Sequence, residues 1–266
     1  MKYVDCEKYA TEILDEVKKQ KHNKYFAIVS VGNDPASQSY IKGKMRDCEY
    51  CGITYMHKRF DVDTPQIEVA NALWQMQSNR DISSIILQMP LPIEYDEDYL
   101  LHIIPYWKDV DGFRSDSKFK PCTPEGIAYL LKKELGDLTG KTALIIGRGK
   151  LVGKPLFNML LDENCTVTMA HSKTRDLERL IQQPFDVIVC AVGKSKFLNL
   201  QLCNAKIVVD VGVNRDENGK LCGDCWAFSE NCKPDMKVTP VPKGIGLMTR
   251  AMLIKHIQET NAVYAE

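Results

Sequence analysis

A short apolar segment that leads through a glycine-rich turn into a helical pattern is the feature that most constrains the fold. Residues 142–146 read TALII, residues 147–153 read GRGKLVG, and a helix is expected from Lys154 to about Glu163. In a dinucleotide-binding unit, this order of strand, glycine turn and helix places main-chain N–H groups against the pyrophosphate. The segment therefore predicts a Rossmann-type domain with a parallel sheet.

The spacing of the glycines is by itself a weak signal for a nucleotide site. Gly147 and Gly149 fit the first two positions of G-x-G-x-x-G, but Val152 occupies the third position and Gly153 follows it. Further strands are expected at 166–171, 186–192 and 205–213. These strands complete a plausible sheet, and the alternative to a cofactor site is an α/β domain whose tight turn binds no ligand.

The end of the second strand of this domain indicates which dinucleotide is bound. An NAD-specific site has an acidic residue there, which binds the ribose hydroxyls. This chain has His171, Ser172 and Lys173 instead, and Arg148 stands in the glycine turn. A cation and a hydroxyl suit a 2′-phosphate, so the sequence favours NADP.

The first half of the chain also alternates helical and strand patterns. Helices are expected near 5–20, around Tyr40 and Lys44, and near 65–78, with strands at 25–30, 53–56 and 84–88. The pattern restarts after LGDLTG at 135–140. Such alternation predicts two α/β domains with parallel strands, which we place at 1–136 and 137–246.

Three polar side chains share one face of the expected second helix. Ser37, Tyr40 and Lys44 are three and four residues apart, so a hydroxyl, a phenol and an amine stand one above another. Such a set can bind a ligand and move protons. In the alternative interpretation, the neighbouring Ile41 and Met45 pack inward and the polar groups only reach past them to solvent.

Gln88 ends a strand that is otherwise suited to burial, SIIL at 84–87. Open α/β sheets present ligand-binding groups at the carboxyl ends of their strands, which makes Gln88 a candidate site residue. The alternative is a polar residue that simply caps the strand.

The charge balance excludes several classes of partner. The 266-residue chain has 35 basic and 35 acidic residues, so no net field attracts nucleic acid or an anionic membrane. The first 20 residues interleave charges with apolar positions, unlike a signal peptide, and no stretch is apolar enough to cross a bilayer. We expect a cytoplasmic protein with small or shape-matched partners.

The ten cysteines are scattered, and we expect free thiols in a reducing compartment. Cys48/Cys51 and Cys222/Cys225 have CxxC spacing, and Cys232 lies seven residues beyond the second pair. A zinc site or redox pair is one interpretation. Against it, the first pair falls in an expected helix, the second follows an Asn-Gly turn, and no convincing fourth ligand is present. We therefore expect no metal.

Several blocks along nearly the whole chain resemble the methylenetetrahydrofolate dehydrogenase/cyclohydrolase family. In order, these blocks are VGNDPASQSYIKGK, QMPLP, KDVDGF, PCTPEGI, GRGKLVGKPL, TVTMAHSKT, DVIVCAVGK, VVDVGVN and TPVPKGIGLMT. The resemblance implies an N-terminal folate-side catalytic domain, an NADP-binding Rossmann domain and a last helix, about 247–266, that returns to the first domain. It also implies a homodimer with the active site in an interdomain cleft.

The resemblance also assigns roles to residues. Lys44 resembles the family's proton-transfer lysine, Tyr40 the aromatic that stacks on the folate, Gln88 the lysine's hydrogen-bonding partner, and Asp111 the carboxylate that fixes the pterin. Without the resemblance, Asp111 would be interpreted as a turn residue before Gly112. Other implied substrate contacts are Ser37, Leu87, Met89, Pro242, Gly244 and Gly246; implied cofactor contacts are Gly147, Arg148, Gly149, Gly153, His171, Ser172 and Val213.

The implied chemistry has two steps and needs no metal. NADP⁺ oxidises 5,10-methylenetetrahydrofolate to the methenyl cation, and water then opens the ring to 10-formyltetrahydrofolate, a reaction sequence of one-carbon metabolism and purine biosynthesis. A lysine that acts as a base should be partly neutral, so we expect a dry pocket and a neutral partner such as Gln88 rather than a carboxylate.

Three positions depart from the family pattern, which usually has Ser at Gly149, Gly at Lys243 and Pro at Leu247. A lysine at 243 could clash with the substrate, turn to solvent or meet the folate's glutamate tail. A short-chain dehydrogenase also uses Tyr-x-x-x-Lys, but there the glycine turn comes first, whereas here Tyr40 and Lys44 precede Gly147. Two further interpretations are a folate- or nucleotide-binding protein without catalysis, and a zinc or redox module.

Overall fold

The computed structural model describes residues 1–227 and 232–263, and the chain divides into two compact units. Unit 1 comprises Met1–Ala10 and Thr123–Thr249; unit 2 comprises Thr11–Cys122 and Arg250–Glu266. The division falls within three helices, α1 (Cys6–Lys18), α5 (Cys122–Leu135) and α8 (Ile245–Val263). The expected functional domains at 1–136 and 137–246, with the returning helix at about 247–266, stay predictions.

The compact units differ from the expected boundary at residues 1–10 and 123–136, and pairing within unit 1 explains the difference. Strand β1 (Lys2–Tyr3) pairs in parallel with β13 (Lys237–Val238). On α5, Glu134 accepts a hydrogen bond from Tyr9 Oη at 2.8 Å and forms an ion pair with Lys237 at 2.6 Å. These contacts tie both segments to the sheet of unit 1.

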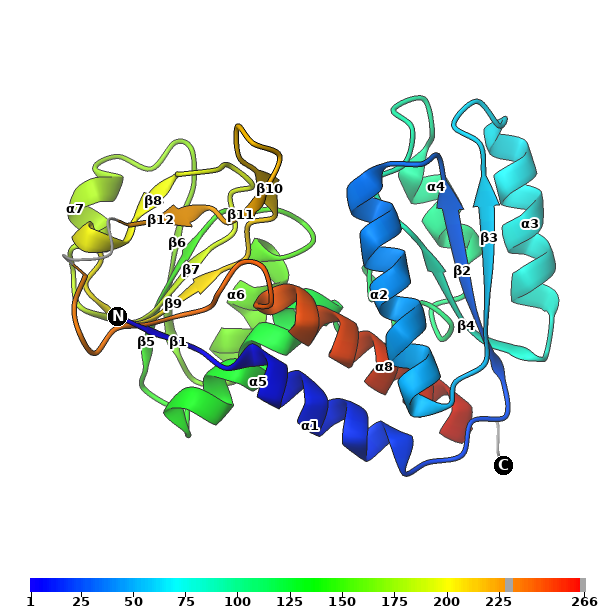
Figure 1. Cartoon of the computed structure of the whole chain (residues 1–266), viewed down its shortest axis with the longest axis horizontal. Helices are drawn as coiled ribbons and strands as arrows, with labels where there is room; N and C mark the ends of the chain where they lie inside the picture. The colour runs from blue at the N-terminus through cyan, green and yellow to red at the C-terminus, as the bar shows by residue number, and fades with distance from the viewer. Residues whose placement is uncertain (228–231, 264–266) are drawn as a thin grey trace. The chain divides into compact units, whose positions relative to one another are not determined.

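Unit 1 contains a six-stranded parallel sheet in the order β1-β13-β9-β7-β5-β6 (Figure 1). Its four longest strands are β5 (Thr142–Ile146), β6 (Thr166–Ala170), β7 (Phe185–Cys190) and β9 (Ala205–Asp210). The expected Rossmann-type sheet is therefore confirmed, and helix α6 (Gly153–Asp162) directly follows the glycine turn. The strand order reverses around β5, the position where such sheets bind dinucleotides.

Shorter elements lie in the connections between these strands. A hairpin joins β10 (Asn214–Arg215) to β11 (Leu221–Cys222) through the predicted Asn-Gly turn, with φ of 74° at Gly219. Strand β12 (Cys225–Trp226) pairs in parallel with β8 (Leu198–Asn199). Within the described residues of unit 1, the remaining helices are the 3-10 turn Leu200–Leu202 and α7 (Leu177–Ile181).

Unit 2 contains a three-stranded parallel sheet in the order β3-β2-β4, accompanied by three helices (Figure 1). The strands are β2 (Tyr25–Val31), β3 (Tyr55–Phe60) and β4 (Ile82–Leu87), and the helices are α2 (Pro35–Cys51), α3 (Gln66–Ser78) and α4 (Glu97–Ile103). The strand expected at 53–56 corresponds to β3, and its expected start at residue 53 is wrong. Gly52 is left-handed and Ile53 N donates to Cys48 O, so these residues close α2 before β3 begins.

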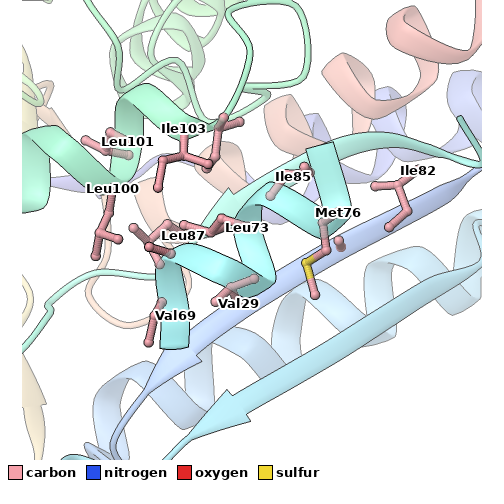
Figure 2. Close-up of a cluster of buried hydrophobic side chains, with 13 residues drawn as sticks. Val29, Val69, Leu73, Met76, Ile82, Ile85, Leu87, Leu100, Leu101 and Ile103 are labelled. Carbon is pink, nitrogen blue, oxygen red and sulfur yellow. The ribbon is translucent and has the colours of Figure 1, made fainter. Parts of the chain in front are cut away.

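One face of β2 and β4 packs against α3 and α4 (Figure 2). Figure 2 shows Val29, Ile85 and Leu87 from the strands beside Leu73 of α3 and Leu100 of α4, all at most 1% exposed. Each such side chain contributes about 1.5–3 kcal/mol of burial free energy. This core fixes the carboxyl ends of β2 and β4, where the functional residues of unit 2 follow.

Candidate active site

The N-terminus of α2 is fixed by its own sequence. The Asp34 side chain accepts a hydrogen bond from Ser37 N at 2.7 Å, and Pro35 occupies the first helical turn. The helix therefore presents the predicted face, on which Tyr40 is half-buried and Lys44 is buried. Lys44 Nζ lies 5.8 Å from the centre of the Tyr40 ring.

Two segments bring polar side chains to the carboxyl end of β4. Gln88 directly follows the strand, and its N–H donates to Val29 O at 2.8 Å. The segment that contains Asp111 runs beside β4, because Ile85 N donates to Lys108 O at 2.8 Å and Ile85 bridges Asp109 in parallel. Both residues consequently reach the same edge of the sheet.

Lys44, Gln88 and Asp111 meet through their side chains. Lys44 Nζ donates to Gln88 Oε1 at 3.2 Å and to Asp111 Oδ2 at 3.3 Å. The Lys44 and Asp111 side chains are 3% and 8% exposed. The expectation that the lysine avoids a carboxylate was therefore wrong, because it has one charged and one neutral partner. A buried ammonium needs such partners to offset its lost hydration.

The loop before Asp111 is held by residues that the sequence did not point to. Val110 O lies 2.8 Å from His256 Nδ1 on α8, and Cys122 Sγ donates to the same oxygen at 3.3 Å. The His256 ring, buried at 2% exposure, stacks on Phe119. Because His256 is 146 residues from Val110 in the chain, no local pattern identifies the contact.

The predicted contacts Ser37 and Met89 also gather at this edge, next to Leu87 at the end of β4. Ser37 Oγ donates to Met89 O at 3.3 Å, and Gln88 Nε2 donates to the same oxygen at 2.8 Å. The second bond fixes the orientation of the Gln88 amide. Its Oε1 is then directed to Lys44, which donates to it.

Asp109, two residues before Asp111, has a structural role, because its carboxyl group binds the main chain of Arg114. Burial raises the pKa of this carboxyl, whereas the hydrogen bond from Arg114 N, at 2.9 Å, lowers it.

The glycine turn of unit 1 has the shape of a phosphate cradle. Gly147 has φ of 116°, and a Cβ on it would lie 2.2 Å from Ala191 O. A Cβ on Gly153 would lie 2.1 Å from Gly147 O, so both positions require glycine. At Gly149, by contrast, an added Cβ meets no described atom within 4 Å, and a serine would fit. These features fit a dinucleotide whose phosphates approach the start of α6.

The predicted 2′-phosphate residues follow neighbouring strands at the same sheet edge. Ile146 of β5 pairs with Ala170 of β6, and Gly147 N donates to Ala170 O at 2.9 Å. Arg148 and Ser172, which come next in the two segments, are both exposed. His171 is more constrained, because its Nδ1 accepts a hydrogen bond from Lys173 N at 3.1 Å.

Val213, Pro242, Gly244 and Gly246 also lie in unit 1, whereas Lys44, Gln88 and Asp111 lie in unit 2. A Cβ on Gly244 would lie 2.0 Å from Pro240 O, which explains the glycine there. Gly246 falls in the first turn of α8.

Lys243 adopts a left-handed backbone with φ of 72°, a conformation that glycine prefers. Its side chain is 72% exposed, and Nζ lies 3.5 Å from Glu7 Oε2.

The cysteine pairs do not form a metal site within residues 1–227 and 232–263. In that part of the chain, no three His, Cys, Asp or Glu side chains gather so that they could bind a metal ion. All ten cysteines are free thiols, and Cys48 and Cys51 are buried on α2. Burial raises the pKa of the Cys51 thiol to about 11, so it is a poor nucleophile. None of the helices in the described ranges is long and apolar enough to cross a membrane.

Comparisons with known proteins match both halves of the chain. The family model "Tetrahydrofolate dehydrogenase/cyclohydrolase, catalytic domain" matches residues 4–111, and the corresponding "NAD(P)-binding domain" matches residues 121–264. The "Bifunctional protein FolD" of Agathobacter rectalis is 37% identical, covering 93% of this chain and 92% of that protein. The protein of that name from Bacillus licheniformis is 40% identical, covering 90% and 87%.

The structural comparison gives the same result. The crystal structure of the bifunctional FolD methylenetetrahydrofolate dehydrogenase/cyclohydrolase from Campylobacter jejuni has a TM-score of 0.90, with 34% identity over 98% of both chains.

Proposed function

Because the chain belongs to the tetrahydrofolate dehydrogenase/cyclohydrolase family, we propose that it oxidises 5,10-methylenetetrahydrofolate with NADP⁺ and hydrolyses the methenyl product to 10-formyltetrahydrofolate. The observation that carries this proposal is the buried contact of Lys44 with Gln88 and Asp111. It supplies an amine, an amide and a carboxylate at the end of one sheet, where α/β proteins bind their ligands. No metal is needed for either step.

Asp111 and Tyr40 hold the pterin in this scheme. A carboxylate can accept two adjacent N–H donors of a pterin as a pair, and a phenol ring offers a flat face for the bicyclic ring. Asp111 already has a partner, because Lys44 Nζ contacts its Oδ2, so a pterin that binds both carboxylate oxygens competes with the lysine for that atom. Binding of substrate therefore loosens the ion pair.

Lys44 moves protons in the hydrolysis step. Once Asp111 turns to the pterin, Gln88 remains as the uncharged partner of Lys44 at 3.2 Å. An amine with a neutral partner in a dry site can release and accept a proton, which general acid–base catalysis requires. Gln88 acts on this step by orienting the amine, because its own amide is fixed on Met89 O.

The residues of unit 1 bind the dinucleotide. Gly147 and Gly153 leave room for phosphates at the start of α6, and Arg148 with His171 and Ser172 selects the 2′-phosphate. NADP⁺ held there would supply the hydride acceptor for oxidation of the carbon that bridges the two folate nitrogens. Val213, exposed beyond the end of β9, and the segment with Pro242, Gly244 and Gly246 complete the proposed contacts.

The family likeness also supports a homodimer and a cytoplasmic location. Within the described residues, β3 pairs with β2 alone, which makes it an edge strand. This edge carries the exposed Met56, and α3 carries the exposed Trp74. A second copy could cover such a surface. Ten free thiols suit a reducing compartment.

A steady-state assay with 5,10-methylenetetrahydrofolate tests the function directly. NADP⁺ and NAD⁺ are supplied separately, and the methenyl and formyl products are followed in the same reaction. We expect both products with NADP⁺ and less with NAD⁺. A purified protein that binds folate but forms neither product would instead be a binding protein without catalysis. Sedimentation of the same preparation tests the dimer.

A further inference from the structure

Asp224 lies between the two cysteines of the second CxxC pair, Cys222 and Cys225. The proposed mechanism assigns no role to its carboxyl group. Asp224 is 0% exposed, although it carries a carboxyl group. Burial of such a group is costly unless hydrogen bonds replace its hydration. The contacts of Asp224 therefore reveal its role.

Four N–H groups meet the Asp224 carboxylate. Oδ2 accepts from Val192 N at 2.7 Å and from Gly193 N at 2.9 Å. Oδ1 accepts from Lys194 N at 2.8 Å and from Asn214 Nδ2 at 2.9 Å. Because a carboxylate offers about four acceptor positions, Asp224 has none left for a substrate proton. This occupancy argues for a positioning role.

The first three donors are successive main-chain N–H groups, and Gly193 has φ of 70°. Such a turn forms an anion-binding concavity, and here the protein's own carboxylate fills it. The turn immediately follows β7, whose last residue is Cys190. Asp224 thus fixes the loop at the carboxyl end of this strand.

The second segment held by Asp224 is the loop after β9, which leads to Asn214 at the start of β10. A Cβ on Gly212 in this loop would lie 2.2 Å from Asp224 Oδ1. Asp224 is itself anchored, because its N–H and that of Gly212 both donate to Asp210 Oδ1 at 2.9 Å. Burial raises the pKa of Asp210, whereas the hydrogen bonds that its carboxylate accepts from three main-chain N–H groups lower this pKa.

Each of these loops exposes one valine. Val192 is 37% exposed and Val213 is 60% exposed, at the carboxyl ends of adjacent parallel strands. In a sheet of this topology, the cofactor crosses the carboxyl edge from β6 and β5 toward β7 and β9. With the 2′-phosphate residues after β5 and β6, the nicotinamide end falls at β7 and β9. The exposed valine side chains at the ends of β7 and β9 offer an apolar surface on which the flat nicotinamide ring can pack.

We propose that Asp224 is a positioning residue for hydride transfer, which holds the Val192 and Val213 loops in the arrangement that receives the nicotinamide. This inference rests on the proposed function of unit 1. It predicts that the two activities respond differently when Asp224 is altered, because the proton-transfer residue Lys44 and its partners Gln88 and Asp111 belong to unit 2.

Asp224→Asn tests the proposal with almost no change in size. The amide NH₂ can accept no hydrogen bond, so at least two of the four donors lose their acceptor. We expect kcat/KM of the dehydrogenase for NADP⁺ to fall at least about tenfold, the effect of roughly 1.4 kcal/mol. Hydrolysis of supplied methenyltetrahydrofolate should change by less than about twofold, because the residues assigned to it belong to unit 2.

Asp186→Asn is the matched control. Asp186 is a carboxylate on β7 itself, near the end of the strand opposite to the loop that Asp224 holds, and it accepts from Thr142 N at 2.8 Å. This variant should lose stability and leave the KM for NADP⁺ unchanged. A rescue variant combines Asp224→Asn with Asn214→Asp, which restores the hydrogen bond between positions 224 and 214 in the reverse direction. This double variant should recover part of the kcat/KM for NADP⁺ that Asp224→Asn loses.

Three results would overturn the proposal: equal loss of both activities in Asp224→Asn, unchanged dehydrogenase kinetics, or the same KM change in Asp186→Asn. If Asp224→Asn does not fold, Asn214→Ala removes one donor and keeps the carboxylate. It should raise the KM for NADP⁺ without changing hydrolysis, and an unchanged KM would also overturn the proposal. A parent protein that lacks dehydrogenase activity would refute the proposed function instead.

Discussion

Lys44 Nζ and Asp111 Oδ2 lie 3.3 Å apart, in side chains that are almost fully buried. Removal of one member of such a pair leaves the other as an uncompensated buried charge, at a cost of about 3–5 kcal/mol. A substitution at either position therefore changes stability as well as chemistry. Rates and melting temperatures should be measured on the same purified variants.

Lys44→Met should reduce cyclohydrolase activity by at least ~10²-fold, the typical contribution of a general acid–base group. Hydride transfer needs no proton from the enzyme, so dehydrogenase activity should fall less and the methenyl product should accumulate. Lys42→Met, which removes an exposed lysine from the same helix, is the control. If Lys44→Met hydrolyses methenyltetrahydrofolate as fast as the parent, Lys44 has only a structural role.

Asp111→Ala should damage both activities, because the pterin loses its carboxylate partner. A lost hydrogen bond to a charged group costs about 1.5–3 kcal/mol, so the KM for folate should rise about tenfold or more. In Asp111→Ala, the KM for NADP⁺ should change less than the KM for folate. Gln88→Ala, by contrast, should reduce hydrolysis more than oxidation. Selective loss of hydrolysis in Asp111→Ala would contradict its assignment to pterin binding.

Arg148→Ala should raise the KM for NADP⁺ much more than the KM for NAD⁺. The charge-assisted contact with the 2′-phosphate contributes on the order of 1.5–3 kcal/mol, and NAD⁺ lacks that group. Arg179→Ala on α7 controls for a general loss of positive charge from unit 1. Equal use of both cofactors by the parent protein would show that Arg148 is not a selectivity residue.

Local patterns in the sequence predicted the parts of the fold that depend on them. TALII and the glycine turn gave β5 and α6 almost to the residue, because strand burial and close backbone packing restrict those positions to apolar residues and glycine. The start of β3 was misplaced because Gly52 and Ile53 are used to close α2. The hydrophobic pattern does not show whether these residues end the helix or begin the strand.

Contacts between distant segments could not be predicted in this way. Arg250 Nε donates to Asp47 Oδ2 at 2.7 Å across 203 residues, and the Arg250 guanidinium occupies the space that a Cβ on Gly43 would need. Neither Gly43 nor Asp47 has a local signature of this contact. The hydrogen bonds from four N–H groups to Asp224 were hidden for the same reason, inside a CxxC spacing that suggested a metal.

His57 should make the stability of the protein depend on pH. Burial lowers the pKa of His57 from 6.5, and the charge of Arg59 lowers it further. The unfolded chain then binds more protons than the folded one between the two pKa values, so stability falls as pH decreases through 6.5 toward the folded pKa. The urea midpoint should drop less between pH 7.5 and pH 5.5, roughly one unit either side of the unfolded pKa, in His57→Gln. An identical drop in the variant and the parent would exclude His57 as its source.

Lys243→Gly should change substrate preference and stability in separable ways. The left-handed backbone at 243 costs a non-glycine residue about 1–2 kcal/mol, partly offset by about 0.5–1 kcal/mol for the greater freedom of glycine in the unfolded chain. Lys243→Gly should therefore be slightly more stable than the parent, whereas Lys243→Ala keeps the Cβ and gains nothing.

Both variants remove the exposed ammonium, so both should bind polyglutamylated folate less well, with monoglutamate binding and turnover nearly unchanged. The loss should be larger at low salt, where the attraction between exposed charges is less screened. Equal effects on the two substrates would exclude contact with the glutamate tail, and equal melting temperatures of the two variants would contradict the expected net gain from glycine at position 243.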